Sequence, residues 1–214
     1  QRIADQLYFG PQISDVSLAR IPDQTGPWIQ TEKPTPGGPN IYGKSGAPPV
    51  ISAPSGIYSA PFAVEITAPG ASEIRYSLDG SAPGPASPLY TDAVTISATR
   101  PLRARAWYPD LDPSPVASAS YFFNPPADRT IPIIDIVMDP QDFDGPDGIY
   151  NNYSERGIEW ERPAHVTVMS PDGAQVFDVE TGVRMHGGYS RGLAKKSLRL
   201  YFRSAYGPDR RRSG

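Results

Sequence analysis

Short runs in which apolar and polar residues alternate make up most of the chain after residue 50, and turn sequences separate them. Alternation with a period of two is typical of half-buried strands, and no run between residues 50 and 123 follows the 3.6-residue period of a helix. We therefore predict an immunoglobulin-like β-sandwich over residues 50–123. Its expected strands are residues 63–67, 73–78, 93–97, 102–107 and 117–123.

Gly-containing turns mark the ends of several strands. The pair at 79–80 (Asp-Gly) suits a tight turn because glycine tolerates a positive φ, and residues 171–173 (Pro-Asp-Gly) are predicted to join two strands in a hairpin. Within residues 102–107 the alternation places leucine and alanine on one face, and it places Arg103, Arg105 and Trp107 on the other.

A second set of strands is predicted from residue 131. Residues 131–139 form an apolar run typical of a buried strand, residues 162–188 a hairpin and its continuation, and residues 195–203 a last strand. In that last strand Lys196 has the same parity as Leu198, Leu200 and Phe202, so it is expected to point toward the covered side of the sheet. The helix candidates are short and lie at 139–143 and 193–196.

The remaining segments are rich in turn residues. Residues 1–40 contain β-like pieces at 6–9 and 16–20, followed by Pro-Gly sequences, and have too little apolar surface for a core of their own. They are interpreted as the edge of a domain that begins before residue 1. Residues 41–49 and 124–130 are predicted linkers.

Composition narrows the possible chemistry. The 26 Pro and 20 Gly agree with short strands and many turns, and the absence of Cys excludes disulfides and thiolate metal sites. With two His, a His-rich metal site is not expected. No apolar run approaches the roughly 18 residues of a membrane-spanning helix. Because the first residues lack both a signal peptide and an initiator Met, we expect the chain to be an internal piece of a longer protein.

Charge is distributed unevenly along the chain, whose formal net charge is −3. Residues 184–214 contain nine Lys and Arg and one acid, a net charge of +8, so the preceding residues carry −11. The basic residues begin in GVRMHGGYSRGLAKKSLRLYF (182–202), whose glycines permit close approach of the backbone to a ligand. Arg and Lys donate well to phosphate oxygens. Two interpretations stay open, a phosphate-binding loop and a solvated hairpin with a basic face.

Other polar candidates each have a structural alternative. Residues 142–147 contain three Asp and loosely resemble a calcium loop, but the spacing is absent and solvated turn acids are favoured. Glu159 and Glu161 could form an acid–base pair, although pairing with Arg162 or Arg184 is the simpler interpretation.

The two histidines and the aromatic residues are read in the same way. His165 lies in a predicted strand and is interpreted as structural, whereas His186 follows Arg184 on one strand face and is a candidate cleft residue. A set of aromatic residues offers a sugar-stacking platform, with core or rim positions as the alternative. They are Trp28, Tyr58, Tyr76, Tyr90, Trp107 and Tyr108.

Three segments resemble known families. Residues 9–40, with SLARIPDQTGPW followed by TPGGPN, resemble the end of a bacterial lamin-tail domain. Residues 48–123, with IRYSLDGSAP, SPLY, LRARAW and SPVASASYFF, resemble the small β-sandwich at the C-terminus of chitobiase and related secreted enzymes, an accessory domain without catalytic residues. Residues 131–207 resemble the start of a spore-coat CotH-type kinase domain, in IPIIDIVMD, GIYNN, WERPAHVTVMSPDG, GVRMHGGYSR and KKSLRLYFRSAYG.

The third resemblance implies a kinase-like fold that transfers phosphate from ATP to protein with a divalent metal. It would make Lys196 the phosphate-contacting lysine, with Arg184 and Arg191 nearby. It also implies that the catalytic and metal-binding acids lie past Gly214. We therefore expect no catalysis by this piece alone, with ATP and Mg²⁺ as cofactors of the full-length parent only.

The sequence thus predicts a mainly β chain in which an immunoglobulin-like β-sandwich precedes the incomplete β-rich N-terminal part of a kinase-like α+β domain. The predicted parts are a lamin-tail remnant (1–40), a linker (41–49), the sandwich (50–123), a second linker (124–130) and the truncated kinase-like part (131–214). Because its sheet is expected to be partly uncovered, residues 131–214 should be less stable than residues 47–124.

The expected role is that of a non-catalytic fragment of a secreted or cell-surface bacterial multidomain protein, whose full-length form resembles an atypical ATP-dependent protein kinase. The alternative is a carbohydrate-binding or spacer sandwich of an extracellular protein. Surface proteins or polysaccharide are the expected partners, whereas nucleic acid and a membrane span are not expected.

Overall fold

The computed structural model describes residues 17–20, 28–31, 45–109, 111–126, 128–203 and 206. The chain divides into two units, Gln1–Ser45 and Gly46–Gly214. In the first unit, β1 (Ser17–Arg20) pairs antiparallel with β2 (Trp28–Thr31). The strand expected at 16–20 is therefore present, β2 was not predicted, and the piece expected at 6–9 lies outside the described residues.

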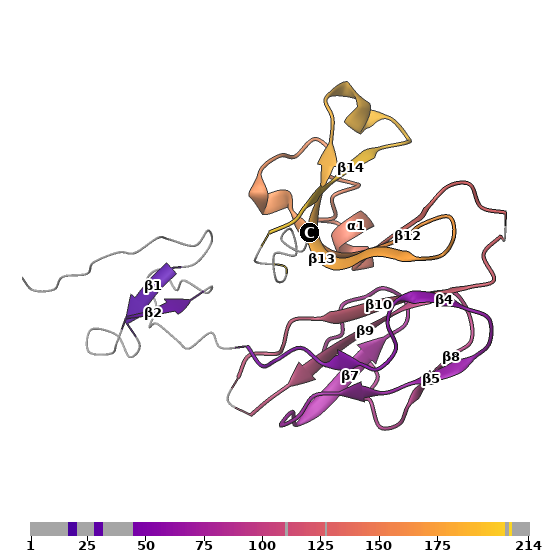
Figure 1. Ribbon diagram of the computed structural model, residues 1–214. Coiled ribbons are helices and arrows are strands. Elements are labelled where there is room, and N and C mark those ends of the chain that lie inside the picture. The colour runs from indigo at the N-terminus through magenta and orange to yellow at the C-terminus, as the bar shows by residue number, and fades with distance from the viewer. Residues whose placement is uncertain are drawn as a thin grey trace, which may run out of the picture. The chain divides into compact units, whose positions relative to one another are not determined.

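The first part of the second unit is a β-sandwich, drawn in purple and magenta in Figure 1. One layer is the sheet β4-β10-β9-β7, in which β10 pairs parallel with β4 and antiparallel with β9. The other layer consists of the antiparallel pairs β3-β6 and β5-β8. The strands are β3 (Val50–Ile51), β4 (Gly56–Tyr58), β5 (Phe62–Val64), β6 (Ile66–Thr67), β7 (Glu73–Ser77), β8 (Val94–Ile96), β9 (Arg100–Trp107) and β10 (Ala117–Phe123).

The sandwich core lies between these layers and accounts for the alternation of the sequence. Val64 and Ile96 from one layer meet Leu102, Ala104 and Tyr121 from the other, and all five are fully buried. Removing this apolar surface from water at about 25 cal/mol per Å² is the main stabilising contribution. The prediction of a mainly β chain that contains a β-sandwich is confirmed, while the kinase-like fold stays a prediction.

One expected strand is interrupted. The run 63–67 divides into β5 and β6 because Glu65 leaves the ladder: its N–H donates to Ser52 Oγ at 2.9 Å, and its carbonyl accepts from the Ser52 N–H at 2.9 Å. The tight turn predicted at 79–80 is confirmed, since Gly80 has a φ of 88° and Asp79 accepts from the Ser81 N–H.

The second part of this unit is an antiparallel sheet of order β11-β12-β13-β14, drawn in orange to yellow (Figure 1). The predicted hairpin is confirmed, with Gly173 at a φ of 92° in the turn between its strands. The strands are β11 (Ile133–Met138), β12 (Arg162–Met169), β13 (Gln175–His186) and β14 (Ser197–Tyr201).

Helices are short throughout the described residues. The candidate at 139–143 corresponds to α1 (Pro140–Asp144), where Asp139 caps the Gln141 N–H at 2.9 Å. The candidate at 193–196 is wrong. The single 3₁₀ turn there is η2 (Tyr189–Gly192), and a further turn, η1 (Ile158–Trp160), precedes β12. None of the helices in the described part of the chain has the length and apolar composition needed to cross a membrane.

The two faces of the C-terminal sheet differ sharply. On one face Ala164, Val183 and Met185 form a core with Leu198 and Leu200, and the segment that carries α1 covers it with Phe143 and Ile149. The predicted parity of Leu198 and Leu200 is thus confirmed. The opposite face is polar, because the register sets Arg184 across from Arg199 and Gly182 across from Tyr201. That polar face carries the candidate site.

Candidate functional site

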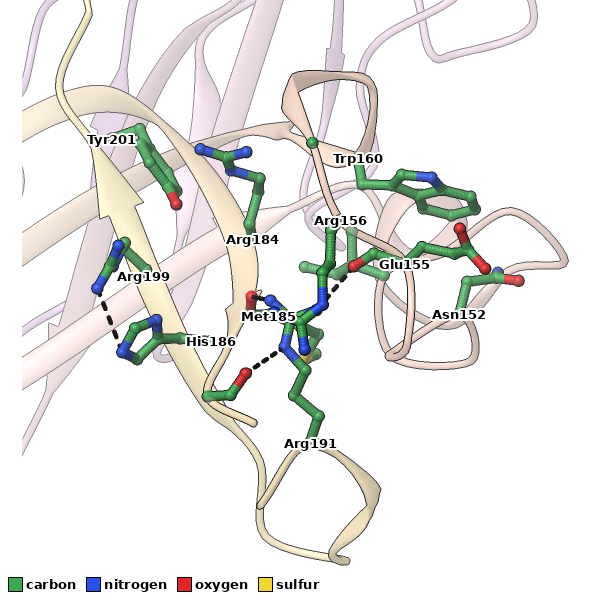
Figure 2. Close-up of a pocket in the computed structure, with 13 residues that line it drawn as sticks. Asn152, Glu155, Arg156, Trp160, Arg184, Met185, His186, Arg191, Arg199 and Tyr201 are labelled. Carbon is green, nitrogen blue, oxygen red and sulfur yellow. Dashed lines mark hydrogen bonds between the residues drawn. The ribbon is translucent and has the colours of Figure 1, made fainter. Parts of the chain in front are cut away.

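A cavity of about 250 Å³ lies where β13 and β14 meet the loop that precedes β12. Figure 2 shows its lining, with side chains from both strands converging on side chains from the loop. Four arginines and His186 line the cavity, and Glu155 is the only acid among the lining residues. The arginines are Arg156, Arg184, Arg191 and Arg199. This excess of positive charge favours a negatively charged ligand.

Arg184 is held on two sides. Its guanidinium lies over the ring of Tyr201, 3.9 Å from the ring centroid, as the upper left of Figure 2 shows. Its Nε is 3.3 Å from Glu161 Oε2, so the pairing expected from sequence is present. The ring and the carboxylate hold the guanidinium at the cavity wall, where the carboxylate competes with an incoming anion for it.

Glu161 is the buried counter-ion of this region. Its side chain is 1% exposed, and its carboxylate accepts from Arg203 Nε at 2.8 Å and from the Tyr206 hydroxyl at 3.0 Å. Burial and the adjacent Glu161 charge raise the pKa of Tyr206 to about 12. A buried carboxylate requires such partners, because an unpaired charge in the interior is strongly unfavourable.

Gly182 provides the space that this carboxylate occupies. A Cβ at Gly182 would lie 2.5 Å from Glu161 Oε1 and 2.7 Å from its Cδ, closer than side chains pack. We predict that Gly182→Ala lowers the free energy of unfolding by about 1–3 kcal/mol, the usual cost of overpacking. Urea unfolding of the variant measures this. Gly188→Ala is the control, because a Cβ there meets nothing within 4 Å, and equal stability of both variants would contradict the role of Gly182.

The Arg191 guanidinium donates its hydrogen bonds to backbone carbonyls. It is 9% exposed and donates from Nε to Gly187 O at 2.8 Å, from one terminal nitrogen to Glu155 O at 2.7 Å, and from the other to Met185 O at 2.7 Å. The dashed lines of Figure 2 mark these bonds. Burial and the nearby Arg156 lower its pKa. Arg191 therefore cross-links the strand to the loop and gives the cavity positive charge rather than free donors.

Lys196 does not line this cavity. Its Nζ donates to Arg191 O at 2.6 Å and to Leu193 O at 3.1 Å, and it lies 4.1 Å from the ring centroid of Tyr153. These bonds satisfy carbonyl groups at the end of η2, where the expected helix does not form. The structure thus brings Arg184 and Arg191 together at one cavity, and Lys196 is not among the residues that line it.

An exposed arginine and an exposed histidine complete the wall. Arg199 and His186 lie side by side, with an Arg199 terminal nitrogen 3.3 Å from His186 Nε2. Because a guanidinium can only donate, Nε2 is the acceptor in this contact. Within the described residues Arg156 makes no ion pair or side-chain hydrogen bond. Arg156 was not a candidate from sequence. Arg199 belongs to the basic stretch 182–202 but was not assigned to a ligand, although the alternation in β14 places Arg199 and Tyr201 opposite the apolar Leu198 and Leu200.

The other candidates have structural roles or remain solvated. Asp142 is half-buried beside Arg162, with 3.6 Å between Oδ1 and Nε, and burial raises its pKa. Within the described ranges no group of three or more His, Cys, Asp or Glu could hold a metal ion. Asp144 and Asp147 are exposed, as the turn interpretation expects.

The aromatic residues of the sandwich serve mainly its core. Tyr58 stacks on Phe62 at 4.0 Å between centroids, and Tyr76 and Tyr90 pack against the core residues. The Tyr90 hydroxyl accepts from the Ile66 N–H, and the Tyr108 hydroxyl donates to Ala47 O. Trp107 is half-buried. The side chain of Trp28 lies outside the described residues.

Comparison with known proteins places the sandwich in a family context. Residues 53–118 match the family model of the chitobiase/beta-hexosaminidase C-terminal domain. Neither the curated proteins nor the solved structures provide a match to the chain. The resemblance stated for residues 48–123 is therefore shown over residues 53–118, where the sandwich is similar to a chitobiase/beta-hexosaminidase C-terminal domain.

Proposed function

We propose that the arginine cavity binds a phosphate-bearing ligand. The observation that carries this proposal is the set of four arginines and one histidine at a single cavity with Glu155 as its only lining acid. Arg156 and Arg199 are exposed and make no pair with a carboxylate among the described residues, so their donors remain available. Guanidinium groups bind phosphate oxygens through paired, charge-assisted hydrogen bonds.

The size of the cavity limits what it encloses. Pockets that bury whole small-molecule ligands measure roughly 300–1,000 Å³. At about 250 Å³ this cavity accommodates a phosphate or pyrophosphate group, with the rest of a larger ligand outside. Trp160 lines the same cavity and offers aromatic surface to such a remainder.

The resemblance of residues 131–207 to a CotH-type kinase domain makes ATP the first nucleotide to test. The arginines suit the phosphate chain of ATP. A bound Mg²⁺ would neutralise phosphate charge, but the described residues supply no cluster of acids to hold it, so no residue is assigned to the metal. The proposal is therefore phosphate recognition by this chain.

The setting we propose is a secreted or cell-surface bacterial multidomain protein. The support is the match of residues 53–118 to a domain named for chitobiase and beta-hexosaminidase. In this setting the sandwich is an accessory module placed before the phosphate-binding sheet.

Titration calorimetry with pyrophosphate and with ATP, each with and without Mg²⁺, tests the proposal. We expect one site, and we expect Arg199→Gln and Arg156→Gln each to weaken binding roughly 10- to 100-fold, the value of a charge-assisted hydrogen bond. Arg75→Gln is the matched control, since Arg75 lies in the sandwich and pairs with Glu73 at 3.0 Å. Binding that is unaffected in the cavity variants, or equally affected in the control, would contradict the proposal.

Lys196→Ala distinguishes two versions of the same proposal. If Lys196 contacts the phosphate of ATP, as the kinase resemblance implies, the variant should lose affinity for ATP and for pyrophosphate to the same extent. If Lys196 only holds the carbonyls of Arg191 and Leu193, the folded variant should bind both ligands as the wild type does. Any loss of binding should then equal the loss of folded protein. Unfolding curves measured beside the titrations separate the two.

A second candidate function is glycan binding by the sandwich, which the family match favours. An open groove of about 1,030 Å³ runs along the loops that follow β7 and β8. Its lining includes Ser81, Ser87 and Asp79 but no aromatic residue, so stacking on a sugar ring has no platform there. Affinity electrophoresis on chitin and cellulose derivatives tests it, and unretarded migration would leave the sandwich a spacer.

A further inference from the structure

A buried polar network joins the sandwich to the C-terminal sheet within the unit Gly46–Gly214. The Ala82 N–H, in the loop after β7, donates to Asp139 Oδ2 at 2.7 Å, directly before α1. Gly80 of the same loop lies against Met138 and Val137 at the end of β11. The two modules therefore contact each other through β11 and the N-terminal cap of α1.

His165 lies on the polar face of β12 and is 4% exposed. Its Nε2 is 2.8 Å from Asp178 Oδ1, and its Nδ1 is 3.1 Å from Glu180 Oε1. An ionised carboxylate can only accept, so both ring nitrogens must carry hydrogen to make both bonds. The geometry thus describes a buried imidazolium between two carboxylates, a charged group that is stable only with such partners.

The same network continues into the sandwich. Asp178 also accepts from Thr167 Oγ1 at 2.6 Å, and the nearby hydroxyl of Ser55, which belongs to the sandwich, helps to lower the pKa of its carboxyl. Ser55 Oγ in turn accepts from the Ser120 N–H of β10 at 2.8 Å. The Ser55 hydroxyl therefore links the backbone of β10 to the surroundings of Asp178, and Asp178 contacts His165.

Arg103 reinforces this junction from β9. The alternation of its strand places Arg103 on the outer face of the sandwich, yet it is only 2% exposed. One of its terminal nitrogens donates to Gly80 O at 2.7 Å, and Glu180 and Asp139 attract its charge. An outer face that buries an arginine has another layer packed on it, and Glu180 of that layer is also one of the two acids that contact His165.

We propose that the sandwich and the C-terminal sheet are held together by a protonation-dependent clasp centred on His165, which closes them into one cooperative unit at neutral pH and releases the sheet at alkaline pH. The clasp consists of Ser55 and Arg103 from the sandwich with His165, Asp178 and Glu180 from the sheet. It involves none of the residues of the arginine cavity, so it stands apart from the proposed phosphate binding.

The charges around the histidine set the direction of its pH dependence. Burial alone would lower the pKa of His165, but the hydrogen bonds to Asp178 and Glu180 outweigh burial and raise it to about 9. Its stabilising effect is therefore complete below the value of about 6.5 for a free histidine and is lost as pH rises through about 9. Other groups face the network from neighbouring elements, namely Arg103 and Arg105 of β9, Tyr121 of β10, and Asp139 and Asp142 at α1.

Protonation of Asp178 weakens the clasp at low pH. Burial by itself raises the pKa of Asp178, but the hydrogen bond and charge of His165 together with Thr167 and Ser55 lower it overall. Its contribution is present above the pKa of an unfolded aspartate and is lost as pH falls through the lowered value. The clasp is therefore closed across the neutral range and opens at both extremes.

Urea unfolding of the whole chain, followed by methyl NMR, tests the clasp. Leu102, Ala104 and Ala119 report on the sandwich core, and Ala164, Val166 and Val183 report on the sheet. At pH 7 we expect both sets to lose their native signals at the same urea concentration. At pH 10 the sheet set should unfold at lower urea than the sandwich set, with its opening equilibrium raised on the order of 100-fold by the lost protonation.

The chain's two histidines supply a matched pair of variants. His165→Gln should show the separated transitions already at pH 7 and little further change to pH 10, whereas His186→Gln, at an exposed histidine, should behave as wild type. Ring ¹⁵N shifts of wild-type His165 at pH 7.5 should show both nitrogens protonated. A neutral ring at pH 7.5, or coincident transitions at pH 10 in the wild type, would overturn the proposal.

Discussion

Replacing Tyr121 with alanine should lower the free energy of unfolding by about 3–5 kcal/mol, the cost of removing a large ring from a packed core. Tyr121 is fully buried and makes edge contacts with Phe62 and Tyr58, at 5.3 and 5.6 Å between centroids. Its hydroxyl donates to Ala53 O at 3.0 Å, which secures the segment that leads into β4. Urea unfolding at pH 7 measures the loss.

Two further tyrosine variants separate the contributions. Tyr121→Phe keeps the ring and removes only the hydrogen bond, so it should cost about 1 kcal/mol. Tyr189→Ala removes a side chain that is 92% exposed and should change stability by no more than about 0.5 kcal/mol. If Tyr121→Ala proved as mild as Tyr189→Ala, β10 would not be central to the sandwich core.

The second large effect is expected at Glu161. Glu161→Ala leaves Arg184 and Arg203 without their shared carboxylate and should cost about 3–5 kcal/mol, because removal of one partner of a buried ion pair strands the other charge. The same change releases Arg184 toward the cavity, so pyrophosphate should bind more tightly to the folded variant. Calorimetry at a temperature where the variant stays folded measures the second effect.

Glu159 provides the matched control, since it lies on the other side of Trp160 and is exposed. Glu159→Ala should change the free energy of unfolding by no more than about 0.5 kcal/mol. Of the two variants, only Glu161→Ala is expected to lower the stability of the chain and to raise its affinity for pyrophosphate. Weaker pyrophosphate binding by a well-folded Glu161→Ala would contradict the assignment of Arg184 to the anion site.

The sequence pattern predicted the features that depend on residues close together in the chain, such as strand faces and turns. Alternation placed Leu198 and Leu200 in the core of the C-terminal sheet. In the sandwich, Asp79-Gly80 marked the turn after β7, because a positive φ strongly favours glycine. The pairing of Glu161 with Arg184 was also foreseen, since opposite charges at adjacent strand ends attract. The family match over residues 53–118 agrees with the motifs that indicated the sandwich.

Features that depend on distant segments were not predictable in this way. Arg103 reads as a solvated residue of β9 until the sheet is packed over it. Arg156 reaches the cavity from a loop whose path turns at Gly157, with a φ of 104°, and nothing in the alternation of the strands indicates that turn. Lys196 shares the parity of the core residues, but it lies one residue before β14 and is drawn to carbonyls of the preceding turn.

The indole N–H signals of the chain's three tryptophans provide the most direct test of phosphate binding. Trp160 lines the arginine cavity, whereas Trp107 lies in the sandwich and serves as an internal control. During a titration with pyrophosphate, we predict that the Trp160 signal shifts and saturates while the Trp107 signal stays in place, and that Arg199→Gln weakens this response. A Trp160 signal that does not move, or one that moves in step with Trp107, would contradict a phosphate site in this cavity.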